Sequence, residues 1–193
     1  MNKTALLSLL LLAIGCASAR PPALPRPSIA PDEERIDVSY RLECDSVSGE
    51  QICVMVGNPL LPLAPRYPML SLGAMKTSGA DGAPARYFLR AVYVNMETWL
   101  HIPDGASLEL RIDGEPLELR GEGSVRSRAK GEQGKVFEVA LYPIAPQVIS
   151  RIAGARTVSV RLRGDFTLEK SLAPANRVYF HMFAKKNIDA GAN

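Results

Sequence analysis

The chain has 193 residues, with 23 Lys and Arg against 20 Asp and Glu and a formal net charge of +3. Charges of both signs are mixed along the sequence, which argues against the dense basic surface of a dedicated nucleic-acid-binding protein. The only long apolar run, residues 5–14, is far shorter than the ~20 apolar residues that a transmembrane helix needs. The remaining length is enough for one domain with its own hydrophobic core.

The first fifteen residues have the pattern of an export signal. Lys3 supplies a positive n-region, the apolar run 5–14 follows it, and small residues come next. An amphipathic helix of a folded domain would need more polar side chains than Ser8, which stands alone in this run. We therefore expect an exported protein, with residues 1–15 as its signal peptide.

Two cleavage sites compete after the apolar run. Residues 13–16, Ala-Ile-Gly-Cys, resemble the lipobox of bacterial lipoproteins, although Ala13 stands where Leu is usual. The resemblance implies acyl chains such as palmitate on Cys16 and an outer-membrane anchor facing the periplasm, because Ala17 rather than Asp follows the cysteine. The alternative is cleavage after the A-x-A sequence 17–19, which would release a soluble periplasmic or secreted protein beginning at Arg20.

Residues 16–35 form a proline-rich segment. Its prolines are Pro21, Pro22, Pro25, Pro27 and Pro31. This composition favours an extended polyproline II chain of about 3.1 Å per residue, or about 45 Å from the cysteine to the last of these prolines. A spacer of this kind suits a protein held in a membrane at one end, so it favours lipidation of Cys16. Residues 36–187 are then expected to form the globular domain, with 188–193 as a C-terminal tail.

Cys44 and Cys53 remain as a pair once Cys16 is lipidated or removed. Cys44 ends an alternating run and Cys53 lies in the next one, with a polar turn between them. This arrangement predicts neighbouring antiparallel strands joined by a disulfide in an oxidising compartment. A metal site would need two further ligands, and redox pairs usually have C-x-x-C spacing, so we expect a structural bridge.

Alternation of apolar and polar residues continues through the domain and predicts antiparallel strands packed on one face. Richness in apolar and aromatic residues places 86–96 and 135–143 near the centre of a sheet. The other expected strands are 69–76, 107–112, 117–120, 156–164 and 165–172.

The Asp-Gly pair at 113–114 stands between two alternating runs and is a strong hairpin signal. A two-residue loop would set Glu109 opposite Glu118. A four-residue loop instead pairs Arg111 with Glu118 and keeps Pro116 out of the ladder. On these grounds we expect the four-residue loop.

A short helix is predicted over 146–154, where Pro146 occupies the first turn and an apolar stripe follows. Residues 174–186 are compatible with helix or strand, and Pro174 with the lysines near the end favours helix. The sequence thus predicts a mainly-β, antiparallel sandwich-like single domain with one or two short helices.

Signatures of catalysis and metal binding are absent from the sequence. Its two histidines, His101 and His181, belong to no HExxH motif, and no G-x-S-x-G elbow marks a nucleophile. We therefore expect neither an enzyme nor a bound cofactor or metal. A cell-wall or ester hydrolase that uses His101 with Asp104 or a remote acid stays as an alternative.

The strongest candidate for an interaction segment is 57–70, where prolines alternate with apolar residues and exclude a regular helix or central strand. These residues either cap the core or form an exposed extended segment that a partner binds. The candidate partner-binding residues are Leu60, Leu61, Leu63 and Tyr67.

Two further segments carry weaker signals. Residues 120–135 contain glycines and five basic side chains but lack phosphate-loop spacing, so a mobile, charged loop is expected, with contact to anionic lipid or cell-wall polymer as the alternative. Trp99 with Tyr87 and Tyr93 would suit sugar stacking, although such residues more often lie in a β-rich core. The sequence favours a non-catalytic, envelope-anchored binding or assembly module whose partner is an envelope protein or cell-wall polymer. A periplasmic hydrolase or a carbohydrate-binding protein is the alternative.

Overall fold

The computed structural model describes residues 41–47, 50–60, 68–79 and 83–189. The expected signal peptide, Cys16 and the proline-rich segment lie outside these ranges. The elements are β1 (Arg41–Val47), β2 (Glu50–Val56), β3 (Met69–Ser78), β4 (Arg86–Met96), β5 (Gly105–Ile112), β6 (Glu115–Gly121), β7 (Arg128–Lys130), β8 (Lys135–Ile144), α1 (Pro146–Gly154), β9 (Val158–Arg163), β10 (Thr167–Ser171) and α2 (Pro174–Asn187).

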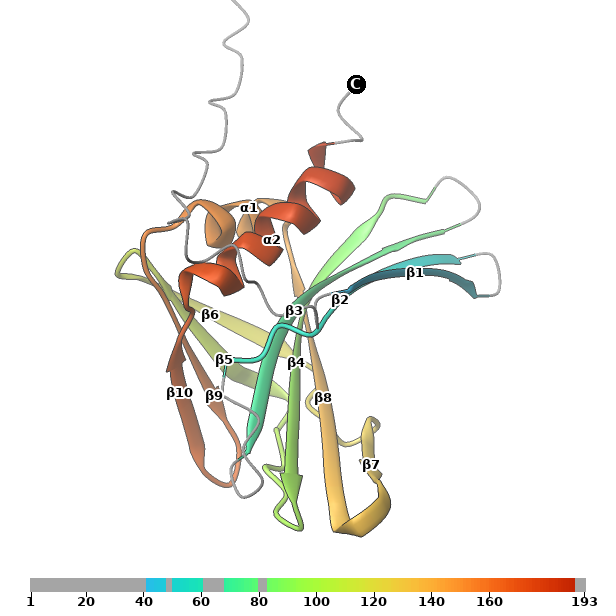
Figure 1. Ribbon diagram of the computed structural model, residues 1–193, viewed down its shortest axis with the longest axis vertical. Coiled ribbons are helices and arrows are strands. Elements are labelled where there is room, and N and C mark those ends of the chain that lie inside the picture. Colours follow the sequence, from blue (N-terminus) through green and yellow to red (C-terminus); the bar gives the residue numbers. More distant parts are fainter. Residues whose placement is uncertain (1–40, 48–49, 61–67, 80–82, 190–193) are drawn as a thin grey trace, which may run out of the picture.

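Two antiparallel sheets form the fold, and α1 and α2 lie together at one end of it (Figure 1). The larger sheet has the strand order β1-β2-β3-β4-β8-β7, and the smaller has the order β10-β9-β5-β6. The expected mainly-β, sandwich-like architecture is therefore confirmed. β4 and β8 pair along nearly their whole length and have neighbours on both sides, which confirms their central position. Within the described ranges, no helix combines the length and apolar character needed to cross a membrane.

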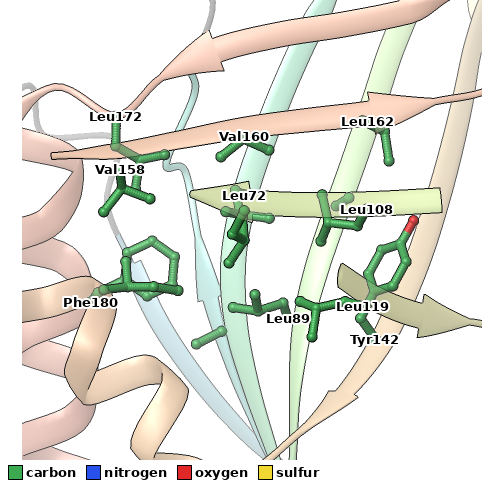
Figure 2. Packing of buried hydrophobic residues seen from close by; sticks show 14 of the residues in the cluster. Leu72, Leu89, Leu108, Leu119, Tyr142, Val158, Val160, Leu162, Leu172 and Phe180 are labelled. Atoms are coloured by element: carbon green, nitrogen blue, oxygen red, sulfur yellow. The ribbon is translucent and has the colours of Figure 1, made fainter. Parts of the chain in front are cut away.

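The core lies between the inner faces of the two sheets, where alternate residues of each strand point inward. Leu72 and Leu89 of the larger sheet face Leu108 and Val160 of the smaller one (Figure 2). Toward the helical end, Phe180 of α2 joins the same cluster. Other fully buried large side chains are Met55, Leu70, Tyr93, Leu100, Ile102, Leu110, Tyr142 and Phe183.

Both helices follow from their apolar stripes. In α1, Pro146 stands in the first turn, where its missing N–H is tolerated, and Ile149 and Ile152 are fully buried. Residues 174–186 are helical, in α2, because burial of apolar side chains such as Phe180 and Phe183 holds them against the core.

Polar contacts fasten both ends of α2 to the larger sheet. At its first turn, the side-chain amide of Asn176 donates to Asn58 Oδ1 at 2.5 Å, and Asn58 donates in turn to the Leu72 carbonyl at 2.9 Å. At its last turn, the carbonyl of Asn187 accepts from Lys76 Nζ at 3.1 Å. The bond from Lys76 satisfies a backbone carbonyl that the end of the helix leaves unpaired.

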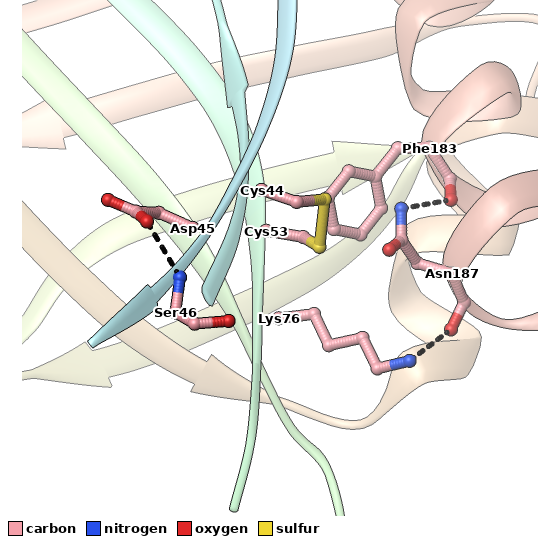
Figure 3. Close-up of a disulfide and its surroundings, with 7 residues drawn as sticks. All are labelled: Cys44, Asp45, Ser46, Cys53, Lys76, Phe183 and Asn187. Atoms are coloured by element: carbon pink, nitrogen blue, oxygen red, sulfur yellow. Dashed lines mark hydrogen bonds between the residues drawn. A yellow bond between two sulfur atoms is a disulfide. The ribbon is translucent and has the colours of Figure 1, made fainter. Parts of the chain in front are cut away.

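The Cys44–Cys53 disulfide joins β1 to β2 as predicted, with the two Cα atoms 4.1 Å apart. Figure 3 shows the bridge on the side of the hairpin that faces α2. In the neighbouring strand, Lys76 pairs directly with Cys53 and reaches α2. The bridge therefore braces the edge of the larger sheet where it meets the last turn of that helix.

The predicted register of the β5–β6 hairpin is wrong. Asp113 and Gly114 form a two-residue turn with φ values of 50° and 90°, so Glu109 lies opposite Glu118. Positive φ at both turn positions is typical of the type I′ turn, which suits the twist of a hairpin. Pro116 stands in β6, the edge strand of the smaller sheet, where a missing N–H is tolerated.

The charge of Glu109 is compensated from the other side of its strand. β9 lies beside β5 and brings Arg161 and Arg163 to 3.3 and 2.9 Å from Glu109 Oε2. The like-charge pair across the hairpin therefore does not decide the register, because a third strand supplies the opposite charges.

Candidate functional site

His101 pairs with a remote acid rather than with Asp104. Its Nδ1 lies 2.6 Å from Oδ2 of Asp165, and the two side chains are 45% and 62% exposed. The ring of Trp99 stacks on the imidazole, with ring centroids 6.2 Å apart and planes 15° apart. With Nδ1–H donated to the carboxylate, a neutral imidazole leaves Nε2 as an acceptor.

The backbone at His101 has a left-handed conformation, with φ at 51°. A single carboxylate, Glu138 of β8, holds it. Its oxygens accept from three consecutive N–H groups, at 2.5, 2.9 and 3.1 Å, donated by Leu100, His101 and Ile102. The successive N–H groups form a concave anion-binding nest, which the protein fills with its own side chain.

Glu138 is fully buried and has two further donors. Ser124 Oγ lies 2.5 Å and Arg128 Nε 3.4 Å from Glu138 Oε2. Burial alone would raise the pKa of Glu138, but the hydrogen bonds from Ser124 and from the backbone N–H groups outweigh it and hold the pKa below its ordinary value. The carboxylate is therefore ionised at neutral pH.

Close backbone packing locks the loops around His101. A Cβ on Gly164 would stand 2.0 Å from the carbonyl oxygen of Leu100, and one on Gly123 would stand 2.6 Å from the Pro103 carbonyl carbon. Asp165 N–H donates to the Leu100 carbonyl at 2.7 Å. The His101–Asp165 pair is thus held rigidly on the surface, above a buried charged cluster.

Sequence reasoning missed this cluster. Glu138 stands at an inward position of a strand predicted to be apolar and central, and a charged residue at such a position was the available signal. Segment 120–135, expected to be a loop, also contains β7 and a 3₁₀ turn at 132–134. Its Ser124 is fully buried.

The three aromatic residues do not form one exposed platform. Tyr93 is fully buried, and Tyr87 and Trp99 are partly buried against the core. The interpretation as core residues therefore holds for Tyr93, and only Trp99 lies beside His101.

Leu60 is the one predicted partner-binding residue within the described ranges. It packs against the core, and its N–H donates to the Leu70 carbonyl at 2.7 Å. Leu60 therefore caps the core. Leu61, Leu63 and Tyr67 lie outside the described residues, so a partner site there stays a prediction.

The outward face of the larger sheet carries apolar residues in register. Across β4 and β8, Phe88 lies opposite Pro143, and Val92 lies opposite Val139. These side chains alternate with the buried ones and keep part of their surface exposed. Phe137, at another outward position of β8, is 36% exposed.

A groove of about 310 Å³ lies on this face, between the sheet and the loop that follows β6. We call it the outer groove. It is lined by Arg86, Phe88, Glu122, Gly123, Arg126, Ser127, Val139, Leu141 and Pro143. Its floor is apolar, and two basic residues and one acidic residue, Arg86, Arg126 and Glu122, are exposed at its margins.

Comparison with known proteins places the chain in no family: no family model matches it, and neither does any curated protein or solved structure. Among the described residues, no three His, Cys, Asp or Glu side chains gather as a metal site would require.

Proposed function

We propose that the protein is a non-catalytic binding module of the bacterial envelope, anchored by acyl chains on Cys16, and that it holds its partner in the outer groove. The observation that carries the proposal is the set of partly exposed apolar side chains on the outward face of β4 and β8, which Arg90, opposite Leu141, interrupts. An antiparallel sheet with one face on the core normally turns polar residues to water on the other. Exposed apolar surface rimmed by polar residues marks interaction sites.

The charges at the groove indicate which partner it fits. Arg86 forms an ion pair with Glu50 at 3.8 Å, and both side chains are largely exposed, so the pair contributes little and leaves the guanidinium available. Arg126 stands on the loop that forms the other wall. An extended segment of an envelope protein, with apolar side chains flanked by acidic ones, matches this floor and these margins.

Photo-cross-linking in native envelopes tests the site. A photoreactive residue in place of Leu141 stands in the groove, and one in place of Met182, which is 46% exposed on α2, serves as the control. We expect one dominant envelope-protein adduct from position 141 that is absent from position 182. Identical adducts from both positions would count against a site in the groove.

The anchor is tested separately, by the intact mass of the mature protein from its native membrane fraction. A mass beginning at Cys16 with added acyl chains supports the tethered module. A mass beginning at Arg20 would contradict the anchor and indicate a soluble exported protein.

A hydrolase is the second candidate, favoured by the 2.6 Å contact between His101 and Asp165. The carboxylate orients the imidazole as a general base requires. Two hydroxyls of the segment after β6 are engaged elsewhere, since Ser124 donates to Glu138 and Ser127 to the Val139 carbonyl. Turnover of an ester or cell-wall substrate that His101→Gln abolishes would establish this candidate, and its absence across a broad substrate screen would remove it.

A further inference from the structure

We infer that the protein has an oxyanion-binding cleft on the outward face of its smaller sheet, which takes a phosphoryl group. The cleft has a volume of about 450 Å³, and no Asp or Glu side chain lines it. Its charged and hydroxyl residues, which we call the arginine cleft, are Arg111, Arg156, Thr157, Ser159, Ser171 and Arg177.

The register of the sheet explains why the cleft is cationic. Arg111, Ser159 and Ser171 stand side by side in one row across β5, β9 and β10. In the adjacent row, Arg161 pairs with Glu109 at 3.3 Å and with Glu169 at 2.9 Å, and Glu109 also pairs with Arg111 and Arg163. The acidic side chains of these strands therefore lie in the row next to that of Arg111, where they pair with arginines. The row of Arg111 contributes hydroxyl groups in place of an acid.

One hydrogen bond holds the guanidinium group of Arg177, and one of its N–H donors has no acceptor among the described residues. Its Nη1 donates to the Arg156 carbonyl at 2.9 Å, and its Nε is buried with no hydrogen-bond partner among the described residues. Arg177 also lines the cleft, where an anion would accept from guanidinium N–H groups other than the buried Nε–H. Arg177 stands in the first turn of α2, where the positive end of the helix dipole adds to its charge.

The acids near the cleft are committed elsewhere. Asp113 Oδ1 accepts the N–H groups of Thr157 and Arg156, at 2.8 and 2.9 Å, and these bonds lower the pKa of Asp113. Glu109 lies 3.4 Å from Arg111 Nε but also binds Arg161 and Arg163. Neither carboxylate lines the cleft.

Three guanidinium groups with neighbouring hydroxyls match the chemistry of a phosphoryl group, which accepts several charged hydrogen bonds at once. Free phosphate and the headgroup of an anionic phospholipid share that chemistry. The cleft lies on the smaller sheet, so it is independent of the outer groove.

Titration calorimetry with inorganic phosphate at low ionic strength tests the cleft, because salt weakens exposed charge interactions. Arg177→Gln and Arg111→Gln should each weaken binding by about tenfold or more, since each removes a charge-assisted hydrogen bond. Arg151→Gln, outside the cleft and paired with Glu115 at 3.0 Å, removes the same charge and should leave binding unchanged. Thermal melting shows which variants are folded, and Arg111→Gln keeps the test valid if Arg177→Gln does not fold.

Vesicle sedimentation separates the two sources of the phosphoryl group. The full chain is made as Cys16→Ser, which carries no acyl chain there; with its arginines intact it is the wild type of this assay. Its binding to phosphatidylcholine vesicles that contain phosphatidylglycerol, but not to pure phosphatidylcholine, assigns a lipid headgroup if Arg177→Gln abolishes it. Phosphate binding without vesicle binding assigns a soluble ligand, and either result supports the cleft. Absence of both kinds of binding in the wild type overturns the inference. So does an equal loss of binding in Arg151→Gln.

Discussion

Replacing Glu138 with Gln removes the charge that holds the loop around His101 and changes the side-chain volume little. The carboxylate accepts hydrogen bonds at 2.5, 2.9, 3.1 and 2.5 Å from Leu100, His101, Ile102 and Ser124. In Gln an NH₂ group replaces one of the two acceptor oxygens. This group is itself a donor, and it would point at the N–H and O–H groups that now donate to Glu138. Four buried donors then compete for a single oxygen.

Removing one side of a buried charged network costs about 3–5 kcal/mol. Single domains unfold with only about 5–15 kcal/mol, so this loss is a large share of the total. For a chain of this size it corresponds to a fall in Tm of roughly 6–20 °C. Urea unfolding followed by fluorescence of Trp99, the single tryptophan, gives the free energy directly.

The pH dependence supplies an independent check. The pKa of Glu138 lies below its ordinary value of 4.5, so its ionised form contributes stability that is complete above pH 4.5. That contribution is lost as the pH falls through the lower pKa of the folded state. The stability difference between wild type and Glu138→Gln should therefore be constant near neutral pH and shrink in acid. A loss below about 1 kcal/mol at pH 7, the usual effect of an ordinary substitution, would refute the assignment.

Further predictions concern the hairpin, the loops, the core and the disulfide. Glu118→Gln removes the like charge across the β5–β6 hairpin and should raise the unfolding free energy by about 0.2–1 kcal/mol in the same urea assay; a decrease would contradict the observed register. Gly164→Ala puts a Cβ 2.0 Å from the Leu100 carbonyl oxygen, so it should lower the unfolding free energy by more than about 2 kcal/mol, and a neutral result would argue against this packing. Burial raises the pKa of Tyr142 to about 12, so ultraviolet titration should show a tyrosine that ionises there, with its contribution to stability complete below pH 10 and lost as the pH rises toward 12. Ionisation of all tyrosines near 10 would exclude that environment. Cys53→Ser opens the disulfide and should cost about 2.7 kcal/mol in the chain-entropy description, measured against the oxidised wild type; equal unfolding free energies would show that the bridge does not stabilise the fold.

Features that depend on neighbouring residues could be predicted from the sequence. Alternation located the strands, the Asp-Gly pair located the β5–β6 turn, and the prolines located both helix starts. The Cys44–Cys53 bridge follows from two adjacent alternating runs. In each case the two interacting segments lie close together in the chain, so the local pattern contains the physical cause.

The register of the β5–β6 hairpin could not be predicted because the deciding charges come from a third strand. In the hairpin alone, a register that sets Glu118 opposite Arg111 is more favourable than one that sets Glu118 opposite Glu109. The structure places Arg161 of β9 beside Glu109, more than fifty residues away in the sequence, and this attraction outweighs the repulsion between Glu109 and Glu118 without removing it. The sequence of one hairpin does not indicate which third strand will lie beside it in the sheet.

The candidate sites were unpredictable for the same reason. Glu138 meets N–H groups 36 to 38 residues earlier in the chain. The arginine cleft brings Arg111, Arg156 and Arg177 together from β5, from the segment before β9 and from α2. The outer groove depends on the loop after β6 folding back over β8. His101 contacts Asp165, an acid 64 residues later in the chain, and no signal in the sequence indicated which acid would lie beside it.

The central claim, that the outer groove holds an envelope partner, is tested most directly by affinity. The protein cross-linked from position 141 is purified, and its Kd is measured for the wild type, Val139→Ser and the control Met182→Ser. Val139 points outward, so its replacement should leave Tm nearly unchanged while weakening binding by about tenfold or more, the value of one buried apolar side chain. Met182→Ser should bind as the wild type does. Equal affinities for the wild type and Val139→Ser would contradict the claim.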